Sequence, residues 1–356
     1  MKLGNNTVRE NGLAVSVDWL SFTLKDCTEA RSALRLLGYA DTDFFAMKKG
    51  RQGYKAALKN TLYNIFILYN GNEDMGVHVD ISGSAVGDVF KHYHDKRLTE
   101  TPWGDLAYSM DDVDDSMLNT VFCDLLREIR ECGGSLTRLD LAIDDHGAKY
   151  FTTGDLYSIL DAGMFSMLFK SFRLEKGRAS NGKTIGETIY IGTRQSACFL
   201  RVYDKKLEQN NKLKELGKPL LTEEWTRWEL ELKDDRAINA GLLLEKGDVL
   251  GSVVVGILMH YIRLIVLDND RRTRCSTLPL WDKFLSCVHE LTIASPFVPK
   301  TIEDKESWII RQVAPSMAAV VLAHSGDMEF IYRALSDGMD RMSPTTRKMV
   351  EAYQSL

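Results

Sequence analysis

Hydrophobic and polar residues alternate along six short stretches of the chain, which is the pattern of half-buried β-strands. These stretches are residues 13–23, 76–82, 136–145, 187–192, 197–204 and 225–233. Between them apolar residues recur at helical spacing, and from about Asp234 onward the pattern is almost wholly helical. We therefore expect an α/β fold of the α+β type: a mainly antiparallel sheet with packed helices, followed by a helical C-terminal part.

The remaining predicted elements fill the gaps between these strands. Further strands are expected within residues 52–69 and 166–174, and helices at 27–38, 85–96, 116–131 and 153–163. A length of 356 residues suggests roughly two domains at about 150 residues each. The change of pattern places the boundary near residue 235, so we expect a mixed-sheet domain at 1–235 and a mainly helical region at 236–356.

Several features favour a cytoplasmic location and no membrane contact. The run from Val249 to Leu267 is apolar and long enough to span a bilayer, but it contains His260, Tyr261 and Arg263. A charge inside the span is costly in lipid, so we expect a buried helix there. The six cysteines form no CxxC pair, and the N-terminus lacks the apolar core of a secretion signal.

Composition constrains how the protein would bind a charged partner. The chain is 44% hydrophobic and 27% charged, which excludes collagen-like, disordered and small disulfide-rich proteins. Its 45 Lys and Arg against 50 Asp and Glu give a net charge of −5, so nucleic-acid binding would need a local basic surface. Residues 166–220 provide one, because 12 basic and 5 acidic side chains give this stretch a net charge of +7.

Three of the predicted strands carry charge on a face where an ordinary sheet would carry apolar groups. Side chains in a strand alternate between its two faces. The three faces hold Arg138, Asp140 and Asp144; Arg227, Glu229, Glu231 and Lys233; and Phe199, Arg201 and Tyr203. If the three strands are neighbours, their four carboxylates meet in one place.

Four carboxylates held that close repel one another unless a cation lies among them. The candidate metal ligands are Asp140, Asp144, Glu229 and Glu231. Hard oxygen ligands suit Mg²⁺ or Mn²⁺, and such an ion polarises a phosphoryl oxygen, which would let a nearby tyrosine hydroxyl act as a nucleophile. The alternative is a solvent-facing sheet with cross-strand ion pairs, because sequence spacing does not fix which strands are adjacent.

Three segments of the chain resemble a known family. TRLDLAIDD at 137–145, YIGTRQSACFLRVYDKKLE at 190–208 and RWELELK at 227–233 are similar, in order and approximate spacing, to the core motifs of the Rep_trans replication-initiation family. That family includes initiators of small rolling-circle plasmids and related relaxases of integrative and conjugative elements. The resemblance covers roughly residues 14–320, and VDWLSFT and KESWIIRQVAPSMA look more like the conjugative-element branch.

The resemblance implies a DNA nicking and joining enzyme. In the family a tyrosine attacks one strand of an origin, stays linked to the 5′ phosphate and frees a 3′ hydroxyl. The tyrosine in the R-[IV]-Y-[DN]-K-K context is Tyr203, and Tyr190 is its rival. Arg201 would hold the scissile phosphate, while Lys205 and Lys233 are weaker candidates for charge stabilisation.

The same resemblance implies a metal and partners. The acidic residues that bind the divalent ion in the family match Asp140 and Glu229 best, and Asp144 and Glu231 less well. Residues 1–235 would be the catalytic nicking domain, acting on origin DNA presented as a single strand or hairpin. A recruited host helicase is implied, as is a homodimer for plasmid initiators. The plasmid initiators are shorter, so they leave the helical C-terminal part unexplained.

Aromatic residues near these motifs bear on strand binding. Single-strand access needs basic grooves and aromatic rings on which bases stack. Trp225, Trp228 and Phe199 fit that role, and they fit a role in the core equally well.

Two further motifs point to other functions. GRASNGKT at 177–184 matches the P-loop pattern, but it is followed by a predicted strand, whereas a P-loop opens a helix. His92 and His94 match a His-hydrophobe-His metal signature, but in a predicted helix they point roughly 200° apart, so we expect exposed helix histidines. A P-loop NTPase and a non-catalytic origin-binding protein stay open as alternatives.

Overall fold

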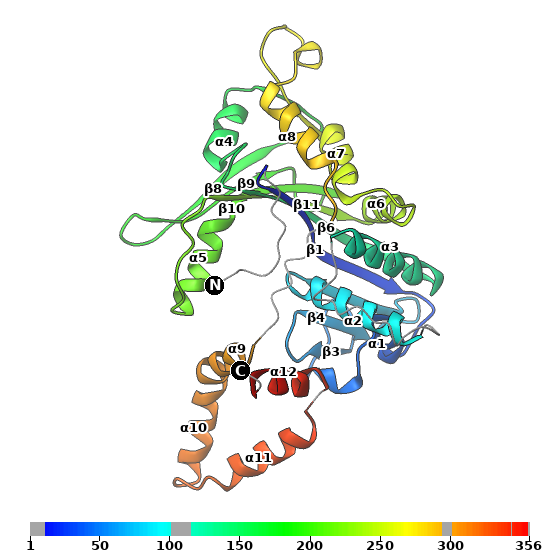
Figure 1. The fold of residues 1–356 in the computed structure, drawn as a ribbon, viewed down its shortest axis with the longest axis vertical. Coiled ribbons are helices and arrows are strands. Elements are labelled where there is room, and N and C mark those ends of the chain that lie inside the picture. The colour runs from blue at the N-terminus through cyan, green and yellow to red at the C-terminus, as the bar shows by residue number, and fades with distance from the viewer. Residues whose placement is uncertain (1–10, 101–114, 294–300, 343, 355–356) are drawn as a thin grey trace.

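A ten-stranded antiparallel sheet organises the residues that the computed structural model describes, which are 11–100, 115–293, 301–342 and 344–354 (Figure 1). The strand order across the sheet is β2-β3-β4-β5-β1-β6-β11-β10-β9-β8. The strands are β1 (Leu13–Leu24), β2 (Phe44–Ala46), β3 (Ala56–Asn60), β4 (Ile65–Tyr69), β5 (Val77–Ser82), β6 (Gly134–His146), β8 (Phe172–Arg178), β9 (Thr184–Ile191), β10 (Cys198–Asp204) and β11 (Trp225–Lys233). The prediction of a mainly antiparallel sheet with packed helices is confirmed.

One face of this sheet forms the hydrophobic core. Alternate residues of each central strand, such as Leu141, Leu200 and Leu230, are fully or almost fully buried on it. The helices packed on this face are α1 (Ala30–Leu37), α2 (Ala85–Glu100), α3 (Asp115–Glu131), α4 (Thr153–Asp161), α6 (Asp235–Glu245), α7 (Leu250–Tyr261) and α8 (Pro279–His289). Burial of their apolar stripes against the strands is the main stabilising term of the fold.

The opposite face of the sheet carries polar, charged and aromatic side chains. Helix α5 (Lys205–Glu215) follows β10 directly and lies on this side, away from α4, α7 and α8 (Figure 1). Asp204 caps the helix, because its Oδ1 accepts a hydrogen bond from the backbone N–H of Leu207 at 2.8 Å. The end of β10 is thereby fixed relative to the start of α5.

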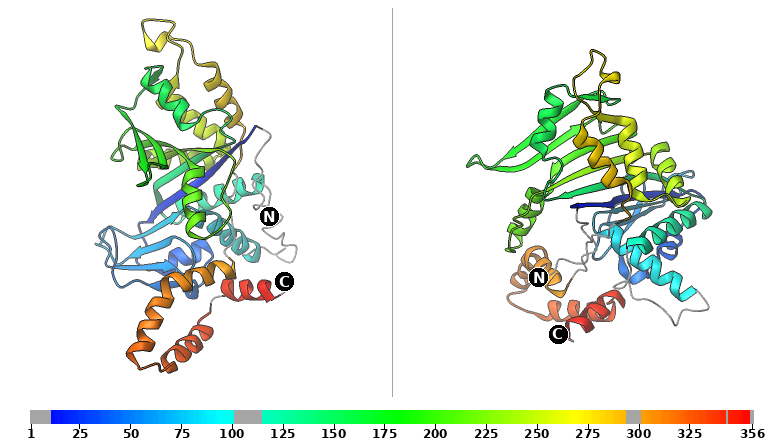
Figure 2. Two further views of the ribbon diagram at one scale, coloured as in Figure 1. Left: turned by 90° about the vertical axis from the view of Figure 1, so that its left-hand side faces the viewer. Right: turned by 45° about the horizontal axis from the view of Figure 1, so that its top comes forward.

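The C-terminal part is helical, as predicted. It consists of α9 (Ile302–Trp308), a π-helical turn (Ile309–Val313), α10 (Ala314–Ala323), α11 (Glu329–Asp340) and α12 (Pro344–Gln354). These helices lie at the end of the molecule away from α4 and α8 (Figure 2). Helices α6 to α8 instead pack into the same hydrophobic core as the sheet. This core therefore does not separate residues 1–235 from residues 236–356, and the division into two domains stays a prediction.

The single helix predicted from Val249 to Leu267 is wrong. Helix α7 ends at Tyr261, and the chain continues as the short strand β12 (Ile262–Leu264), which pairs with β7 (Phe165–Met167) in a separate two-stranded sheet. Ile262 and Leu264 are buried and Arg263 between them is not, which is the alternation of a strand. No helix among the described residues combines the length and apolar character needed to cross a membrane.

Two other local predictions need correction. The single strand expected at 166–174 is two strands, β7 and β8, and β8 continues to Arg178 as one arm of a hairpin with β9. Strand β2 was not predicted, because it is three residues long and only one of its side chains is buried. Short 3-10 turns span Asp41–Asp43 and Arg272–Arg274.

Candidate active site

The three strands with charged faces are neighbours in the order β6-β11-β10. In the antiparallel register Asp140 lies opposite Glu231, and Glu229 lies opposite Arg201. Residues opposite one another across two strands point to the same face, so these side chains meet on the polar face of the sheet. The contacts join segments that are far apart in the sequence.

Three carboxylates gather around the guanidinium of Arg201. Asp140 is fully buried, and Glu229 and Glu231 are 4% and 5% exposed. Arg201 donates a hydrogen bond to Glu229, and its Nη2 lies 3.5 Å from Asp140 Oδ2 and 3.9 Å from Glu231 Oε2. Its Nε is buried with no hydrogen-bond partner among the described residues, so the cluster leaves one polar group unsatisfied.

Two more cations close the cluster from the side of β6 and β11. Arg138 donates to both oxygens of Asp140, at 2.8 and 2.6 Å, and to Glu231 Oε2 at 2.9 Å. Lys233 Nζ lies 2.6 Å from Glu231 Oε1. Such charge-assisted pairs hold the carboxylates close together in spite of their mutual repulsion.

Burial governs the protonation of this cluster. It raises the pKa of Asp140 from 3.8 to about 7, helped by the charges of Glu229 and Glu231 and opposed by Arg138. The pKa of Glu229 is also raised by burial, although Arg201 acts against the shift. The present cations therefore do not fully offset the cost of burying these carboxylates, and a further positive charge would be favoured there.

Asp144 is held apart from the cluster. Arg227 donates to both of its oxygens at 2.7 Å, and Trp225 Nε1 donates to Oδ1 at 2.6 Å. Burial alone would raise the pKa of Asp144, but the charge and hydrogen bonds of Arg227 bring it below its ordinary value. The structure thus joins three of the four predicted metal ligands and pairs the fourth with an arginine.

Tyr203 lies on the same face, opposite Arg227 and two residues from Arg201. Its hydroxyl accepts a hydrogen bond from Lys205 Nζ at 3.4 Å. Lys205 is 8% exposed and also contacts Glu208 Oε2 at 2.6 Å. Burial raises the pKa of Tyr203 well above 10.0 and, together with the charge of Arg227, lowers the pKa of Lys205.

The rival tyrosine, Tyr190, lies opposite Arg201 on β9. The cations near it approach its ring: the guanidinium carbon of Arg173 is 4.7 Å from the ring centroid, and that of Arg194 is 6.0 Å away. Lys205 likewise lies 5.4 Å from the ring centroid of Tyr203, but it also donates a hydrogen bond to the hydroxyl of that tyrosine. This hydrogen bond distinguishes the surroundings of Tyr203 from those of Tyr190.

The sequence analysis did not identify Asp18, which is the second carboxylate paired with Arg227. Arg227 Nη1 donates to Asp18 Oδ1 at 2.7 Å. Asp18 lies at a register shift of β1 against β6, between Val17 and Trp19. A signal for it was present in the sequence, because the large aliphatic residues stand at odd positions from Leu13 to Val17 and the apolar core residues stand at even positions from Leu20 to Leu24, as a β-bulge requires.

The arrangement of the carboxylate oxygens decides whether a metal ion fits in the acidic cluster. Carboxylates such as Asp140, Glu229 and Glu231 are the ligands that Mg²⁺ and Mn²⁺ prefer. Within the described ranges, no group of three or more His, Cys, Asp or Glu residues is already spaced to hold an ion. The donor chemistry fits a divalent ion, provided that Arg201 leaves the space between the carboxylates.

Comparison with known proteins agrees with the motifs. The sequence model of the Rep_trans family, described as replication initiation factor, matches residues 134–334, more than half of the 356 residues. The chain belongs to this family. The match includes all three strands of the acidic cluster and Tyr203.

Individual relatives extend the similarity over the rest of the chain. A protein of Bacillus subtilis (strain 168) named "Putative DNA relaxase NicK" is 28% identical over 362 residues, which cover 98% of this chain and 92% of the relative. A solved structure of a rolling circle replication initiator protein from Geobacillus stearothermophilus superposes with a TM-score of 0.63 at 26% identity, covering 80% of this chain and 99% of the other.

The P-loop pattern lies in a β-hairpin. Residues 177–184 run from the end of β8 through a turn to the start of β9, and Lys183 is exposed beside that turn. Its backbone N–H donates to Asn181 Oδ1 of the same turn at 3.0 Å. No helix N-terminus follows to bind phosphate, so the structure does not support the nucleotide-binding interpretation.

The two histidines of the His-hydrophobe-His pattern lie in α2, as predicted, but they are partly buried rather than exposed. The ring of His92 stacks on Tyr39 with centroids 4.0 Å apart. Tyr93 between the histidines is buried in the core. In this helix, His92 and Tyr93 therefore serve in packing.

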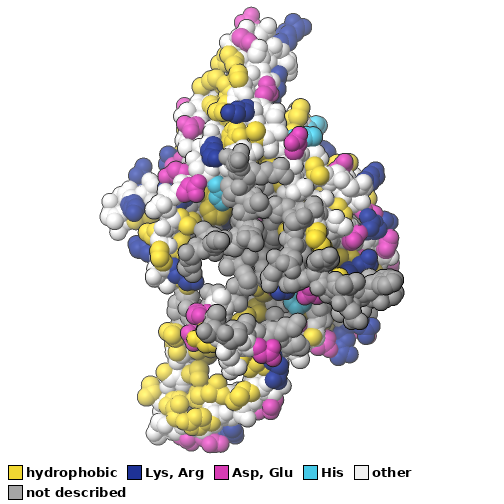
Figure 3. Space-filling view, in the orientation of Figure 1, with side chains coloured by type: hydrophobic (Ala, Val, Ile, Leu, Met, Phe, Trp, Pro, Cys, Tyr) yellow, Lys and Arg dark blue, Asp and Glu magenta, His cyan; other side chains and the backbone are white. Residues whose placement is uncertain are grey.

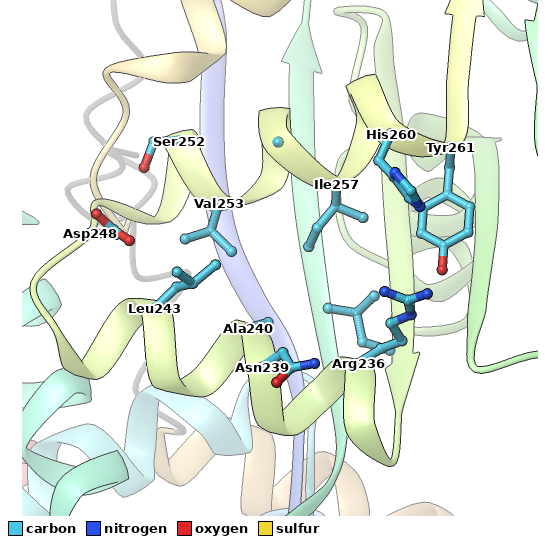
Figure 4. A pocket seen from close by; sticks show the side chains of 12 residues that line it. Arg236, Asn239, Ala240, Leu243, Asp248, Ser252, Val253, Ile257, His260 and Tyr261 are labelled. Carbon is cyan, nitrogen blue, oxygen red and sulfur yellow. The ribbon is translucent and has the colours of Figure 1, made fainter.

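A cavity of about 340 Å³ lies between α6 and α7 on the core side of the sheet (Figure 4). Arg236, His260 and Tyr261 gather at one end of it, and β11 contributes Leu232. Leu232 and its neighbour Glu231 point to opposite faces of the strand, so the cavity is separate from the acidic cluster.

Proposed function

We propose that this protein nicks and rejoins one strand of origin DNA through Tyr203, and thereby starts rolling-circle replication or conjugative transfer. Membership of the replication initiation factor family supports the class, and the relatives named as a relaxase and a rolling circle initiator support the reaction. The observation that carries the proposal is the position of Tyr203, with its hydroxyl against Lys205 and next to Arg201 and the acidic cluster.

In the proposed step the oxygen of Tyr203 attacks the phosphorus of the scissile phosphodiester. The bond between phosphorus and the 3′ oxygen breaks, the 5′ phosphate stays on the tyrosine, and the 3′ oxygen leaves with a proton as a hydroxyl. Rejoining is the reverse attack by that hydroxyl. Because both bonds are phosphodiesters, the energy of the broken bond is kept for resealing.

Cationic side chains favour this chemistry. Lys205 donates to the tyrosine oxygen and stabilises the phenolate as its proton leaves, which offsets the raised pKa of Tyr203. Arg201 is two residues away on the same face, roughly 7 Å along the strand, where its two-pronged guanidinium can hold the scissile phosphate. Lys233 stays a weaker candidate, since it is paired with Glu231.

Asp140, Glu229 and Glu231 are the residues proposed to hold Mg²⁺ or Mn²⁺. When bound, such an ion supplies Lewis-acid polarisation of a phosphoryl oxygen. The pairing of Asp144 with Arg227 supports a structural role for this fourth carboxylate, contrary to the expectation from sequence spacing. The origin DNA, a host helicase, a homodimer and a cytoplasmic location are carried forward from the sequence as predictions.

A plasmid assay tests the proposal. A supercoiled plasmid that carries the protein's own locus is incubated with the protein and Mn²⁺, and open circles are measured. We expect nicking by the wild type and none by Tyr203→Phe, which lacks the attacking oxygen but keeps the ring. Binding without nicking by the wild type would instead establish a non-catalytic origin-binding protein.

A further inference from the structure

An aromatic platform lies next to the proposed catalytic centre on the polar face of the sheet. The ring of Tyr190 on β9 and the ring of Phe199 on β10 have centroids 5.9 Å apart and planes only 7° apart. Phe199 is 1% exposed, while Tyr190 is partly exposed. Phe199 therefore supports the Tyr190 ring from within the protein, and the accessible part of the platform is Tyr190.

Two exposed arginines flank this ring. Arg173 lies directly opposite Tyr190 on β8, and its guanidinium carbon is 4.7 Å from the ring centroid. Its side chain is 61% exposed and also pairs with Glu175 at 3.1 Å. Arg194, in the loop between β9 and β10, approaches the same ring to 6.0 Å. The platform thus combines a flat aromatic ring with two arginines that are exposed to solvent.

The platform is also close to the site of nicking. Tyr190 is opposite Arg201, whereas Tyr203 is opposite Thr188, so the two tyrosines are offset by two residues on adjacent strands. Two residues of a strand span roughly 7 Å. A DNA strand with its scissile phosphate at Tyr203 and Arg201 would therefore bring a neighbouring base over Tyr190.

Charge around the platform favours a nucleic acid. Hairpin β8–β9 carries Arg173, Lys176, Arg178 and Lys183, and it projects from the sheet (Figure 1). Lys and Arg side chains are spread over this projection in the space-filling view (Figure 3). Basic grooves combined with aromatic rings are how proteins bind single-stranded nucleic acid without reading its sequence.

We propose that Tyr190, supported by Phe199 and flanked by Arg173 and Arg194, is a stacking subsite for a base of the single DNA strand beside the scissile phosphate. The assignment rests on the proposed function for the identity of the strand. A base stacked on Tyr190 displaces Arg173 from the ring, and the freed guanidinium contacts the base or a phosphate. Tyr190 has a binding role here and is not the nucleophile.

Binding to a nicking-deficient protein tests the subsite. The probe is a single-stranded oligothymidylate that carries 2-aminopurine, and its anisotropy and fluorescence are measured with the Tyr203→Phe protein, without divalent ions. Adding Tyr190→Leu is expected to weaken binding by about tenfold or more and to abolish the quenching of 2-aminopurine, because the ring is lost. Adding Tyr190→Phe is expected to retain the quenching, because a ring remains.

A second ring on the same face provides the matched control. Phe66 on β4 has the guanidinium of Arg51 4.5 Å from its centroid, but it lies six strands away from Tyr190, roughly 29 Å across the sheet. Phe66→Leu should therefore leave binding and quenching as they are. Wild-type quenching with Tyr190→Leu, or an equal loss with Phe66→Leu, would overturn the subsite.

A third variant keeps the test independent of folding. Arg194→Gln changes an exposed loop side chain and should reduce the dependence of the affinity on salt concentration, because one phosphate-directed cation is lost. An unchanged salt dependence would count against the proposal. Failure of the proposed function has a different signature, since it would appear as nicking by Tyr203→Phe whatever residue stands at 190.

Discussion

Arg201 and Glu229 face each other across β10 and β11, and this pair places a guanidinium among three buried carboxylates. The position is the one that a divalent ion would take if Asp140, Glu229 and Glu231 were its ligands. The buried and unpaired Nε of Arg201 indicates that the guanidinium is not the best possible occupant of this space. Metal binding would therefore require Arg201, the proposed phosphate-binding arginine, to move.

Removing the cation of Arg201 should make the protein depend more on metal. We expect Arg201→Gln to lower the free energy of unfolding by about 1–3 kcal/mol without divalent ions, because the carboxylates lose a charged partner. Mn²⁺ should then raise the melting temperature of the variant more than that of the wild type, since an ion that binds only the folded state stabilises it.

Thermal unfolding with and without Mn²⁺ measures this difference. Arg130→Gln is a suitable control, because Arg130 is paired with Glu245 on the helical side and its side chain is 51% exposed. Equal Mn²⁺ shifts in the wild type and Arg201→Gln would show that the guanidinium and the ion do not share the space.

The raised pKa of Asp140 predicts a pH dependence of stability. The folded protein holds the proton up to a pKa of about 7, whereas the unfolded chain releases it near 3.8. Between these values the folded state binds more protons, so this residue's contribution to the free energy of unfolding falls as pH rises. Asp140→Asn removes that component.

Urea unfolding of the wild type and Asp140→Asn across this pH range, without divalent ions, isolates the effect. The free energy of unfolding of the wild type should decrease relative to that of the variant as pH approaches 7. Two parallel curves would mean that Asp140 ionises with an ordinary pKa in the folded protein.

Asp144 should act through stability rather than through metal. Asp144→Asn leaves the buried Arg227 with Asp18 as its remaining carboxylate partner, and we expect a loss of about 3 kcal/mol in the free energy of unfolding. Its nicking defect should follow the unfolded fraction and should not be relieved by more Mn²⁺. Glu231→Gln, in the acidic cluster, should instead raise the Mn²⁺ concentration needed for nicking.

Parallel chemical denaturation and Mn²⁺ titrations of nicking distinguish these two carboxylates. An Asp144→Asn protein that keeps wild-type stability but needs more Mn²⁺ would restore Asp144 as a metal ligand, as the sequence pattern suggested.

The local alternation of hydrophobic and polar residues was sufficient to predict the strands that carry the site. The predicted strand at 225–233 has the bounds of β11, and its alternation correctly separates Glu229 and Glu231 from the core residues Trp228 and Leu230. The hairpin formed by β9 and β10 was also visible, because two alternating runs are separated by the short segment TRQS. In such runs the neighbouring residues decide both the conformation and the buried face.

Long-range pairing was not visible. Arg227 contacts Asp144 from 83 residues away and Asp18 from 209 residues away, and no local pattern reports such a contact. The same limit explains the error at residues 249–267, since Ile262 becomes a strand residue by pairing with Met167. For this reason the sequence alone identified the four carboxylates but not which three of them meet.

The proposed function requires that Tyr203 becomes joined to DNA, and a covalent adduct would reveal this linkage. The intact protein is incubated with Mn²⁺ and DNA from its own locus, its mass is measured, and any adduct is mapped to a peptide. We expect a DNA fragment linked through its 5′ phosphate to Tyr203, absent from Tyr203→Phe and still formed by Tyr190→Phe. An adduct on Tyr190, or no adduct although binding is confirmed, would contradict it.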